Sequence, residues 1–506
     1  MSALVTDLLA RSARLYPDRR AVRIVGGSSL TYAELSRRVA RVAGLLARSG
    51  VGRGDRVAVM APGGLAFFDT YLGAARLGAA AVPISTRLAL PEISRQLADA
   101  DPATVIVGAG YGEAVAQASH RAVPLIEHGS REYERQLCSS DPAPSTARPE
   151  DTALIIYTSG TTGDPKGVCL SQAALTFNAY VTAVSQELRH SDAYLSATPL
   201  YHASAGLRVI TMLVDGQTHV VLPSFDADAA ISTISEEEIT TTIMVATQLQ
   251  RIFDSRRFDP EAFRKMRLLL YGAAPTGSNL VERMMDSLPC GLYHGYGLTE
   301  ASAVCAALGP EDHHRLAGEH RSVLSCGRPI VGVDVAIRRP DGREAEPGEV
   351  GELLVRTPKL MSGYWRQPEA TSQAIRNGWL HTGDLGHRDA EGHIYLSGRI
   401  KELIISGGVN IYPPQIEDVL SCHPRVAEVA VIGLPDDRWG EAVTAVVVPR
   451  PGQSPTLAEI ADWVGARLAS HMKPKRLILT EQLPRGATGK VEKHRLLELH
   501  GNRSAR

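Results

Sequence analysis

The sequence predicts an α/β protein with a large N-terminal domain of helix-covered sheets, a small β-rich subdomain and a small α+β domain at the C-terminal end. Three observations predict this fold class. Strand and helix patterns alternate through the first part of the chain, which favours a mostly parallel sheet covered by helices. From about residue 326, short alternating runs are separated by Asp-Gly, Pro-Gly and Glu-Gly turns, which are typical of hairpins. After residue 400, a compact segment of about a hundred residues again mixes strands and helices.

The elements of the first part follow from local signals. Thr31-Tyr32-Ala33-Glu34 has the spacing of a capping box, and apolar residues then recur at helical spacing, so we predict an amphipathic helix over 32–49. A buried strand is predicted at 56–60, and a second helix, which follows the breaker Pro62-Gly63-Gly64, extends to about Leu77. A polar, proline-rich loop at 139–149 precedes another buried strand at 154–157.

The second half of the chain divides into a β-rich region and a final mixed segment of strands and helices. The predicted strands of the β-rich region are 333–337, 351–356 and 393–396, and the final segment contains strands at 426–433 and 442–448 and a helix at 457–469. The boundary between the two regions falls near 399–402. We therefore predict domains at 1–399 and 400–506.

Composition excludes several classes of protein. A chain of 506 residues is long enough for two or more domains. A net charge of −1 argues against a nucleic-acid partner, and no apolar run approaches the roughly 18–20 residues that span a bilayer. The N-terminal residues show no secretory signal, so we expect none. The six cysteines are scattered, which favours reduced thiols in a cytoplasmic enzyme over disulfides or a zinc site.

A run of hydroxyl and glycine residues, Tyr157-Thr-Ser-Gly-Thr-Thr-Gly-Asp-Pro-Lys-Gly167, begins where the strand at 154–157 ends. Its glycines permit close approach of the backbone to an anion, and its hydroxyls and Lys166 suit phosphate oxygens. A Walker A loop ends in Gly-Lys-Ser/Thr, whereas Lys166 lies between Pro165 and Gly167. The run therefore predicts a phosphate-binding loop of another kind, in preference to a flexible linker.

The loop resembles the signature of the acyl-adenylate-forming superfamily, which includes acyl-CoA synthetases, amino-acid-adenylating domains and firefly-type luciferases. The other motifs of that family follow in order, so the resemblance covers nearly all 506 residues and is greatest to aryl- and medium-chain acyl-CoA ligases. It implies ATP-dependent activation of an aromatic or medium-chain carboxylic acid to acyl-AMP with release of pyrophosphate, then transfer of the acyl group to the thiol of CoA. It also implies that 400–506 is a mobile cap domain with its hinge at Lys401.

Such chemistry needs a cradle for phosphates and a divalent cation. The resemblance assigns the cradle to Thr158, Ser159, Gly160, Thr161, Thr162, Gly163 and Lys166. Magnesium would be held by the hydroxyl of Thr161 and the carboxylate of Glu300, which suits the preference of magnesium for oxygen ligands. Glu300 ends the motif Tyr296-Gly297-Leu298-Thr299-Glu300. On its own, a Gly-Leu-Thr-Glu tetrapeptide most often marks a helix N-terminus. Here its distance in sequence from the phosphate loop matches the distance found in the family.

The resemblance builds the nucleoside pocket from three places. Gly272, Ala273 and Ala274 follow a strand and are small enough for flat packing of a base against backbone. Tyr296 offers an aromatic face, with Gly297 and Thr299 beside it. Asp384 would accept hydrogen bonds from the ribose hydroxyls, and Arg399 would complete that side. Without this context, a turn residue and a surface ion pair are the more ordinary interpretations of Asp384 and Arg399.

Lysine is scarce, since the 54 basic residues are 46 arginines and eight lysines. A position that keeps lysine therefore indicates a role that arginine cannot fill. Lys490, in the frame Pro-x-x-x-Thr-Gly-Lys, matches the family's catalytic lysine. The resemblance implies that Lys490 bridges the acid's carboxylate and the α-phosphate during adenylation. Lys490, Thr161, Glu300 and His202 are the expected catalytic residues.

The second half-reaction would use a different face of the cap. Residues that match the CoA-contacting positions of chlorobenzoate-type ligases are Ser406, Gly407, Gly408, Trp439, Lys473 and Lys475. An indole and two cations suit the adenine and phosphates of CoA. His471 departs from the family pattern, which has an aromatic residue before the basic pair. Core packing of Trp439 is the alternative interpretation.

The acid would lie against Tyr201, His202, Thr247 and Gly272. Members that activate α-amino acids have an aspartate where this chain has His202, so an amino-acid substrate is not expected. Ala246 replaces a proline that is common in the family, with an effect on the pocket wall that the sequence does not predict.

Other functions share the same motifs. A stand-alone adenylating enzyme would load the phosphopantetheine of an acyl carrier protein in place of CoA. The adenylate could also serve another nucleophile such as an amine, or the fold could activate a different oxyacid. A nucleotide-binding regulatory protein is disfavoured because Lys490, Glu300 and Arg399 are all present.

Overall fold

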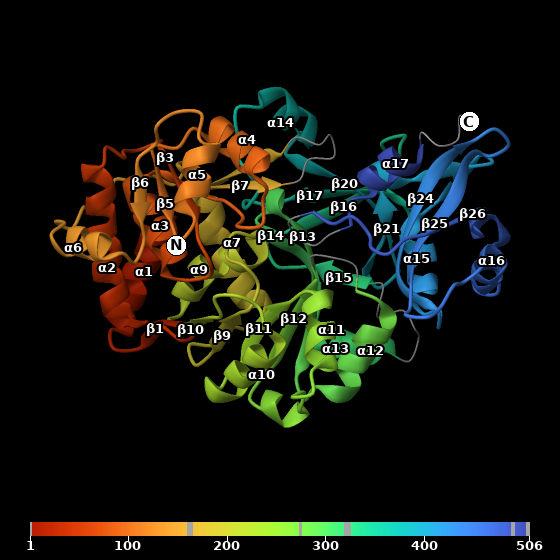
Figure 1. Ribbon diagram of the computed structural model, residues 1–506, viewed down its shortest axis with the longest axis horizontal. Coiled ribbons are helices and arrows are strands. Elements are labelled where there is room, and N and C mark those ends of the chain that lie inside the picture. The colour runs from red at the N-terminus through yellow and green to blue at the C-terminus, as the bar shows by residue number, and fades with distance from the viewer. Residues whose placement is uncertain (1–2, 159–164, 273–275, 318–324, 487–490, 502–506) are drawn as a thin grey trace.

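The computed structural model describes residues 3–158, 165–272, 276–317, 325–486 and 491–501. Strands among these residues form sheets of fourteen, seven and five strands. The two large sheets and their helices make up the greater part of the molecule, while the five-stranded sheet forms a smaller lobe at the right of Figure 1. The protein is therefore a mixed α/β molecule with a large N-terminal and a small C-terminal part, as the sequence predicts.

The seven-stranded sheet has the order β18-β8-β7-β4-β3-β5-β6. Its strands from β7 to β6 pair in parallel, whereas β8 and β18 are antiparallel additions at one edge. The predicted strands at 56–60 and 154–157 are β3 and β7. The bounds are β3 Arg56–Met60, β4 Ala80–Pro83, β5 Thr104–Val107, β6 Leu125–Glu127, β7 Thr152–Thr158, β8 Lys166–Ser171 and β18 Gly363–Tyr364.

The fourteen-stranded sheet has a parallel part and an antiparallel part. The strands β1, β10, β9, β11, β12 and β13 are parallel, and β2 pairs with β1 at the edge. Their bounds are β1 Arg20–Ile24, β2 Ser29–Thr31, β9 Ala193–Ser196, β10 Thr218–Val221, β11 Thr241–Met244, β12 Leu268–Gly272 and β13 Gly291–Leu298.

The predicted β-rich region continues this sheet through β14 and β15, which pair antiparallel with their neighbours. Strand β15 also pairs with β21, and the hairpins then run outward in the order β21-β20-β17-β16. The region is thus hydrogen-bonded to the large sheet. The bounds are β14 Ala303–Leu308, β15 Ser325–Pro329, β16 Asp334–Arg338, β17 Gly351–Arg356, β19 Ile375–Arg376, β20 Trp379–Arg388 and β21 Ile394–Arg399.

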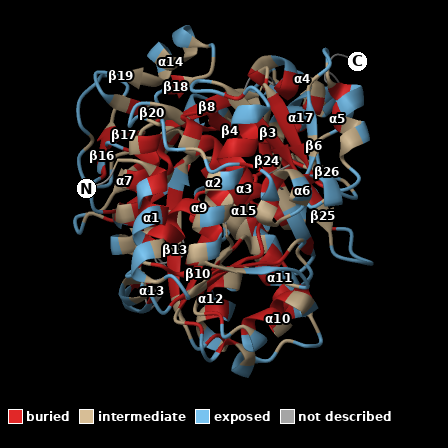
Figure 2. Ribbon diagram, turned by 90° about the vertical axis from the view of Figure 1, so that its left-hand side faces the viewer, coloured by how far each residue is buried: buried red, intermediate tan, exposed pale blue. Residues whose placement is uncertain are grey.

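Helices cover the sheets and leave the strands buried (Figure 2). The predicted helix at 32–49 is α2 Tyr32–Arg48, and both hydrogen bonds of its capping box, between Thr31 and Glu34, are present. The other helices of the large part are α1 Val5–Leu15, α3 Leu65–Leu77, α4 Leu90–Ala100, α5 Gly112–Ala118, α6 Arg131–Cys138, α7 Gln172–Ser185, α8 Ala203–Gly206, α9 Arg208–Thr211, α10 Ala227–Glu236, α11 Ala246–Asp254, α12 Ser278–Ser287, α13 Pro310–Ala317 and α14 Pro368–Ala374.

A buried carboxylate joins α2, α3 and α6. Asp69 on α3 is fully buried and accepts hydrogen bonds from Arg38 of α2, from the hydroxyl of Tyr133 of α6, and lies 2.9 Å from Nε2 of His128. Burial by itself would raise the pKa of Asp69, but the hydrogen bond to His128 and the charge of Arg38 bring that pKa down to about 2. The carboxylate is therefore charged and fully paired inside the fold.

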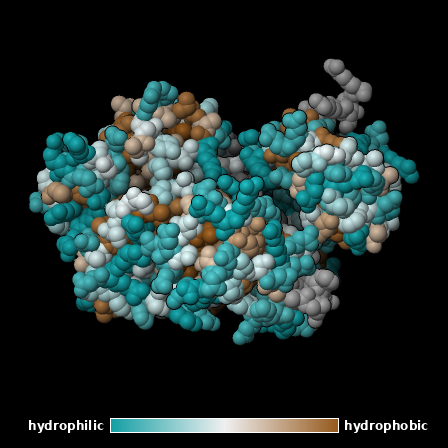
Figure 3. All heavy atoms as spheres, turned by 60° about the horizontal axis from the view of Figure 1, so that its bottom comes forward, coloured by the Kyte–Doolittle hydropathy of each residue, from teal (hydrophilic) through white to brown (hydrophobic). Residues whose placement is uncertain are grey.

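The small lobe has its own sheet, in the order β23-β22-β25-β24 with β26 beside β25. It packs its own apolar clusters, and it stands apart from the larger body across an indentation in Figure 3. The predicted boundary near 400 stays a prediction that this separation supports. The bounds are β22 Ile404–Ser406, β23 Val409–Ile411, α15 Pro413–Ser421, β24 Val426–Asp436, β25 Gly440–Pro449, α16 Leu457–Gly465, β26 Arg476–Leu479 and α17 Lys493–Gly501.

Helix α16 ends at Gly465, before the end of the predicted helix at 457–469. The end of the Lys473 side chain lies against Gly465 in the space that a Cβ would take. Glycine also disfavours continuation of the helix. Among the described residues, helices that combine the length and the apolar character of a membrane span are absent.

Candidate active site

The predicted acid and nucleotide residues meet at one edge of the fourteen-stranded sheet. The parallel strands β13, β12, β11 and β9 are neighbours in that order. Tyr296 and Gly272 lie near or at the carboxyl ends of β13 and β12, and the segments that follow β11 and β9 contain Thr247 and the Tyr201–His202 pair. Ligands of open α/β sheets bind outside the carboxyl ends of the strands. The fold thus gathers at one edge residues that lie almost a hundred positions apart in the sequence.

Two glycines bring backbone strands close together at this edge. Gly272 has a φ of +143°, and a Cβ there would lie 2.5 Å from the carbonyl oxygen of Gly295 on β13. A Cβ at Gly297 would overlap the carbonyl oxygen of Ala303 on β14. Side chains are therefore excluded at both positions, which leaves a backbone surface suited to a flat base. The neighbouring predicted residues Ala273 and Ala274 lie outside the described residues.

Tyr296, Asp384 and Arg399 form a hydrogen-bonded triad. The hydroxyl of Tyr296 donates to Oδ2 of Asp384 at 2.7 Å, and Nε of Arg399 donates to Oδ1 at 2.7 Å. Strands β20 and β21 place Asp384 opposite Arg399 in register, and Asp384 is also held by its own N–H, which donates to Oγ1 of Thr382. Burial would lower the pKa of Arg399, but the charge of Asp384 and the hydrogen bond to it, together with the charge of Glu402, raise that pKa above its usual value. The sequence predicts Asp384 and Arg399 on the same side of the nucleoside pocket, and the bonds that Tyr296 and Arg399 donate to Asp384 are additions of the structure.

The phosphate loop joins β7 and β8, whose ends place Thr158 opposite Lys166. Ser159, Gly160, Thr161, Thr162 and Gly163 lie outside the described residues. Nζ of Lys166 sits 4.9 Å from the centre of the Tyr364 ring, and the hydroxyl of Tyr364 donates to Oε1 of Glu300 at 3.0 Å. Burial and then the charge of Glu300 raise the pKa of Tyr364, so the phenol stays protonated. One tyrosine therefore contacts both the loop lysine and the predicted metal carboxylate.

Glu300 lies in a short 3-10 turn, Thr299–Ala301, which is followed by two residues with positive φ, Ser302 at +50° and Ala303 at +77°. The fully buried Lys359 holds this strained turn, because its Nζ donates to the carbonyl of Val304 at 2.5 Å and its own carbonyl accepts from the hydroxyl of Ser302. Burial lowers the pKa of Lys359 to about 8. Strained backbone that its surroundings over-determine is common at functional sites.

Sequence reasoning did not predict roles for Tyr364 and Lys359. The scarcity of lysine is a signal that could have singled out Lys359. Tyr364 carries no such signal in the sequence, since its partners Lys166 and Glu300 come from distant segments.

Five of the six predicted CoA residues form one cluster on the small lobe. Ser406, Gly407 and Gly408 make the turn of the β22–β23 hairpin, and both glycines have positive φ, as a two-residue hairpin turn requires. The N–H of Gly407 donates to the carbonyl of Trp439 at 2.7 Å. Trp439 is half-buried, with Nζ of Lys475 5.1 Å and the guanidinium of Arg438 4.8 Å from its ring centre. The indole is thus flanked by cations and is not packed inside the apolar clusters of the lobe.

The other lysines of the lobe are placed differently. Lys473 pairs with Asp462 of α16 at 3.7 Å, so the structure does not join it to the Trp439 cluster by any described contact. Lys401 is exposed in the 3-10 turn Ile400–Glu402, next to Glu402, which pairs with Lys493 at 3.1 Å. Lys490 lies outside the described residues.

On the acid side, Tyr201 and His202 stack edge to face with ring centres 4.6 Å apart, immediately before the small-residue helix α8. Gly206 closes this segment, since its N–H donates to the carbonyl of His202 and a Cβ there would lie 2.5 Å from the carbonyl oxygen of Leu200. Thr247 is exposed on α11.

A second group of possible metal ligands, Asp389, Glu391 and His393, lies in the turn between β20 and β21. Nε2 of His393 is 2.9 Å from the guanidinium of Arg315, which can only donate, so Nε2 accepts and Nδ1 carries the ring proton. Nδ1 faces Asp389 at 3.3 Å. This arrangement holds the hairpin turn together and leaves no imidazole lone pair for a metal.

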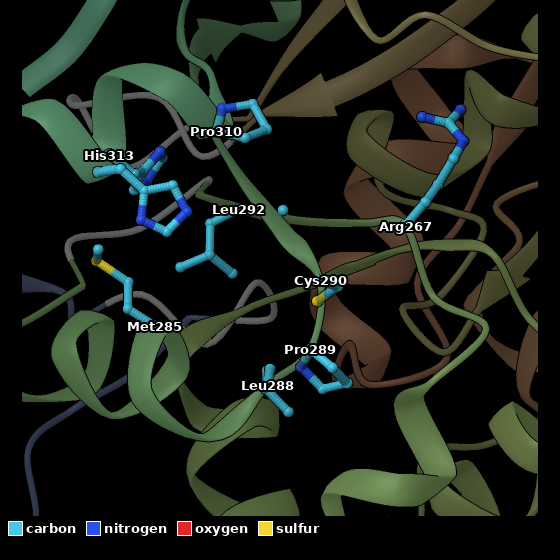
Figure 4. Close-up of a pocket in the computed structure, with 10 residues that line it drawn as sticks. Arg267, Met285, Leu288, Pro289, Cys290, Leu292, Pro310 and His313 are labelled. Atoms are coloured by element: carbon cyan, nitrogen blue, oxygen red, sulfur yellow. The ribbon is translucent and has the colours of Figure 1, made fainter.

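A cavity of about 350 Å³ lies at the opposite, amino-terminal ends of β12 and β13 (Figure 4). Two of its polar side chains are already engaged: Arg267 is turned away to pair with Asp192, and His313 bridges the hydroxyl of Tyr271 and the carbonyl of Gly309. The cavity is therefore separate from the residues gathered at the carboxyl edge.

Comparison with known proteins matches residues 9–365 to the AMP-binding enzyme family and residues 415–490 to the AMP-binding enzyme C-terminal domain. The chain is 38% identical over 484 residues to a feruloyl-CoA synthase of Amycolatopsis sp, covering 96% of each chain. It is 37% identical over 508 residues to an indoleacetate–CoA ligase of Aromatoleum aromaticum, covering 98% of each. Its structure is similar to the o-succinylbenzoate coenzyme A synthetase of Bacillus subtilis in complex with ATP and a magnesium ion, with a TM-score of 0.86, 30% identity and coverage of 97% and 98%.

Proposed function

The chain belongs to the AMP-binding enzyme family, and we propose that its substrate is an aromatic carboxylic acid, which it activates with ATP and magnesium before transfer to CoA. It is an AMP-forming acid–thiol ligase. In the first half-reaction, a carboxylate oxygen attacks the α-phosphorus of ATP and pyrophosphate leaves. In the second, the thiol sulfur of CoA attacks the acyl carbon and AMP leaves. The choice of an aromatic acid over a medium-chain acid rests on the acyl groups in the names of the two relatives.

The arrangement of Tyr296, Asp384 and Arg399 carries the nucleotide part of the proposal. Asp384 is buried but keeps acceptor capacity beyond its two bonds, since an ionised carboxylate offers about four lone-pair sites. The side chain of Arg399 is 47% exposed, so the triad opens toward solvent on one side. We assign the ribose hydroxyls of ATP to Asp384, and the base to the backbone surface between Gly272 and Gly297.

The residues around Glu300 fit magnesium. Glu300 is half-buried, its Oε1 accepts from Tyr364, and a carboxylate beside phosphate oxygens is the oxygen-rich setting that magnesium prefers. Glu300 would hold the ion together with Thr161, which lies outside the described residues. When bound, magnesium supplies charge neutralisation between the phosphates. Lys166 of this chain would then contact the phosphate oxygens from the β8 side of the loop.

Lys490 is the proposed source of positive charge at the α-phosphate. Removing a charge contact that is made in the transition state costs roughly 3–4 kcal/mol, a factor of about 10²–10³ in rate. Lys490→Ala should therefore abolish most acyl-AMP formation, measured by pyrophosphate release, and leave the reaction of supplied acyl-AMP with CoA largely intact. Equal loss in both half-reactions would contradict the assignment.

The test of the whole function is pyrophosphate release against a panel of aryl, fatty and amino acids, with and without CoA. Aryl acids should give the highest kcat/KM, and CoA should be converted to the aryl thioester. A preference for fatty acids would overturn the substrate class. Rapid acylation of a holo acyl carrier protein with no reaction of free CoA would overturn the acceptor.

The Trp439 cluster gives a second test of the acceptor. Trp439→Ala combined with Lys475→Ala should raise the KM for CoA at least tenfold, which corresponds to about 1.4 kcal/mol, because the indole and the ammonium would no longer contact the nucleotide end of CoA. Adenylation without CoA should barely change. Lys265→Ala, which alters an exposed lysine paired with Glu238, is the matched control. An unchanged CoA dependence in the double variant would remove the cluster from the site.

A further inference from the structure

A single short segment, residues 361–365, links the phosphate-loop hairpin to the turn that holds Glu300. On one side, the N–H of Met361 donates to the carbonyl of Glu300 at 2.8 Å. On the other, the N–H groups of Ser362 and Trp365 donate to the carbonyls of Cys169 and Gly167 on β8, at 2.9 and 2.7 Å. Strand β18 is thus the edge of the seven-stranded sheet, while Met361, just upstream of Ser362, is bonded to the Glu300 turn between β13 and β14 of the fourteen-stranded sheet.

Tyr364 is the side chain that this segment directs between the two sheets. Its hydroxyl donates to Oε1 of Glu300 at 3.0 Å, and its ring face lies 4.9 Å from the ammonium of Lys166. The phenol therefore lies between two groups of opposite charge: Glu300 accepts from its hydroxyl, and Lys166 contacts its ring face. The described contacts include no direct ion pair between Lys166 and Glu300.

The backbone fixes Tyr364 in this place. Gly363 has a φ of +151°, and a Cβ there would lie 2.8 Å from the side chain of Thr371. The N–H of Tyr364 donates to Oγ1 of the same Thr371 at 2.9 Å. The indole of Trp365 is anchored too, since its Nε1 donates to the carbonyl of Asp99 at 3.0 Å. The backbone of the tyrosine is therefore held on both sides, and its hydroxyl is held by Glu300.

Lys166 and Glu300 carry opposite charges and both contact the side chain of Tyr364, so without the ring between them they would attract each other into an ion pair. In that ion pair, the ammonium of Lys166 would no longer be available to phosphate oxygens, and the carboxylate of Glu300 would no longer be available to a cation. With the ring in place, Lys166 is held weakly enough to leave for phosphate oxygens, and the hydroxyl fixes one oxygen of Glu300 so that the other faces away from it.

We propose that Tyr364 is a positioning residue for the metal–nucleotide complex: its hydroxyl orients Glu300, and its ring keeps Lys166 apart from Glu300 until phosphates bind. This inference rests on the proposed function for its ligands, ATP and magnesium, and not on the identity of the acid.

The test uses the full chain with Tyr364→Phe, which removes the hydroxyl and keeps the ring, and Tyr364→Leu, which removes both. Binding of ATP is measured by titration calorimetry at varied Mg²⁺, without any acid, so the readout does not depend on turnover. Tyr364→Phe should raise the Mg²⁺ concentration for half-maximal binding at least fivefold. Tyr364→Leu should do the same and also weaken ATP binding several-fold at saturating Mg²⁺, because Lys166 then pairs with Glu300.

A double-mutant cycle separates positioning from mere stability. In a Glu300→Ala background, Tyr364→Phe should change the Mg²⁺ dependence less than twofold, since the hydroxyl has lost the group it orients. Tyr395→Phe is the matched control: its hydroxyl also donates to a carboxylate, that of Asp389 at 3.0 Å, but in the turn outside the site. It should leave the Mg²⁺ dependence unchanged.

Two results would overturn the inference: an unaltered Mg²⁺ dependence in Tyr364→Phe, or a shift that persists undiminished in the Glu300→Ala background. Failure of the proposed function looks different, because it would appear in the parent protein as binding of ATP without pyrophosphate release for any acid. The binding titrations would still decide the role of Tyr364 in that case.

Discussion

Two aspartates of this protein, Asp69 and Asp384, are each bound by a tyrosine hydroxyl and an arginine, yet the two sites have opposite character. Asp69 is fully buried and is also bound by His128, and Arg38 reaches it through both Nε and Nη2. Asp384 is held by Tyr296 and by Nε alone of Arg399, whose side chain is 47% exposed compared with 15% for Arg38.

The difference shows how the same three residue types serve structure or binding. Around Asp69, the carboxylate is fully buried and bound by Arg38, His128 and Tyr133, so the network serves to hold α2, α3 and α6 together. Around Asp384, two bonds fix the orientation of the carboxylate and leave acceptor capacity toward the open side. Substitutions at the first site should therefore change the stability of the fold, and substitutions at the second should change the affinity for nucleotide.

The largest effect is expected at the buried site. Asp69→Asn keeps the shape of the side chain but removes the buried charge that pairs with Arg38, which is then left with the partly exposed Glu134 alone. Breaking a buried pair typically costs 3–5 kcal/mol. Urea unfolding followed by circular dichroism measures it. A loss below about 1 kcal/mol would mean that the network does not stabilise the fold.

The converse is expected at the open site. Asp384→Asn should lower the free energy of unfolding by no more than about 1 kcal/mol, because the site is partly solvated. It should weaken ATP binding by about 1.5–3 kcal/mol, or roughly 10–100-fold, since hydrogen bonds to a charged acceptor are lost. Equilibrium binding of ATP and of its 2′,3′-dideoxy analogue tests whether the loss comes from the ribose hydroxyls. The analogue lacks those hydroxyls and should therefore bind the parent and the variant with the same affinity.

Acid pH should sharpen the comparison through Asp69. Because its folded-state pKa is lowered from 3.8 to about 2, its charged form contributes about 2 kcal/mol of stability above pH 4, and this contribution is lost as the pH falls from 4 to 2. The difference in unfolding free energy between the parent and Asp69→Asn should therefore shrink over that range. A difference that stays constant from pH 5 to pH 2.5 would contradict the assignment.

The smallest effects are expected from the paired tyrosines. Tyr133→Phe and Tyr296→Phe each remove one hydroxyl from an aspartate that keeps its arginine, at a cost of about 1 kcal/mol. For Tyr133 the cost should appear in the free energy of unfolding, and for Tyr296 mainly in the dissociation constant for ATP. If both variants changed the free energy of unfolding alone, or both changed the dissociation constant for ATP alone, the distinction between the two sites would be wrong.

Local signals in the sequence predicted the individual elements well. The capping box at Thr31 and Glu34 located α2, and the apolar run at 56–60 coincides with β3. Pairing between distant segments was beyond such signals. The union of the β-rich hairpins with the large sheet depends on β15 meeting both β14 and β21, and no periodicity in one segment records which strand it will meet.

The site residues divide in the same way. Motif positions such as Glu300, Asp384 and Trp439 were predicted, because each motif is contiguous in the sequence. The contacts that orient them were not: the bonds from Tyr364 to Glu300 and from Tyr296 to Asp384 join segments 64 and 88 residues apart. Lys473 and Lys475 were both predicted from the match to CoA ligases, and the ion pair of Lys473 with Asp462 of α16 is a contact that the motif does not record.

The small lobe shares no described strand pairing with the two large sheets: β21 ends at Arg399 in the large sheet, and β22 begins at Ile404 in the small one. Genetic exchange at this point would break no sheet and would divide no apolar cluster of the lobe. Recombination between related chains could therefore transplant the segment after residue 399 as one inheritable unit. In such hybrids, the affinity for the thiol would come from one parent and the choice of acid from the other, so the two specificities could evolve at different rates.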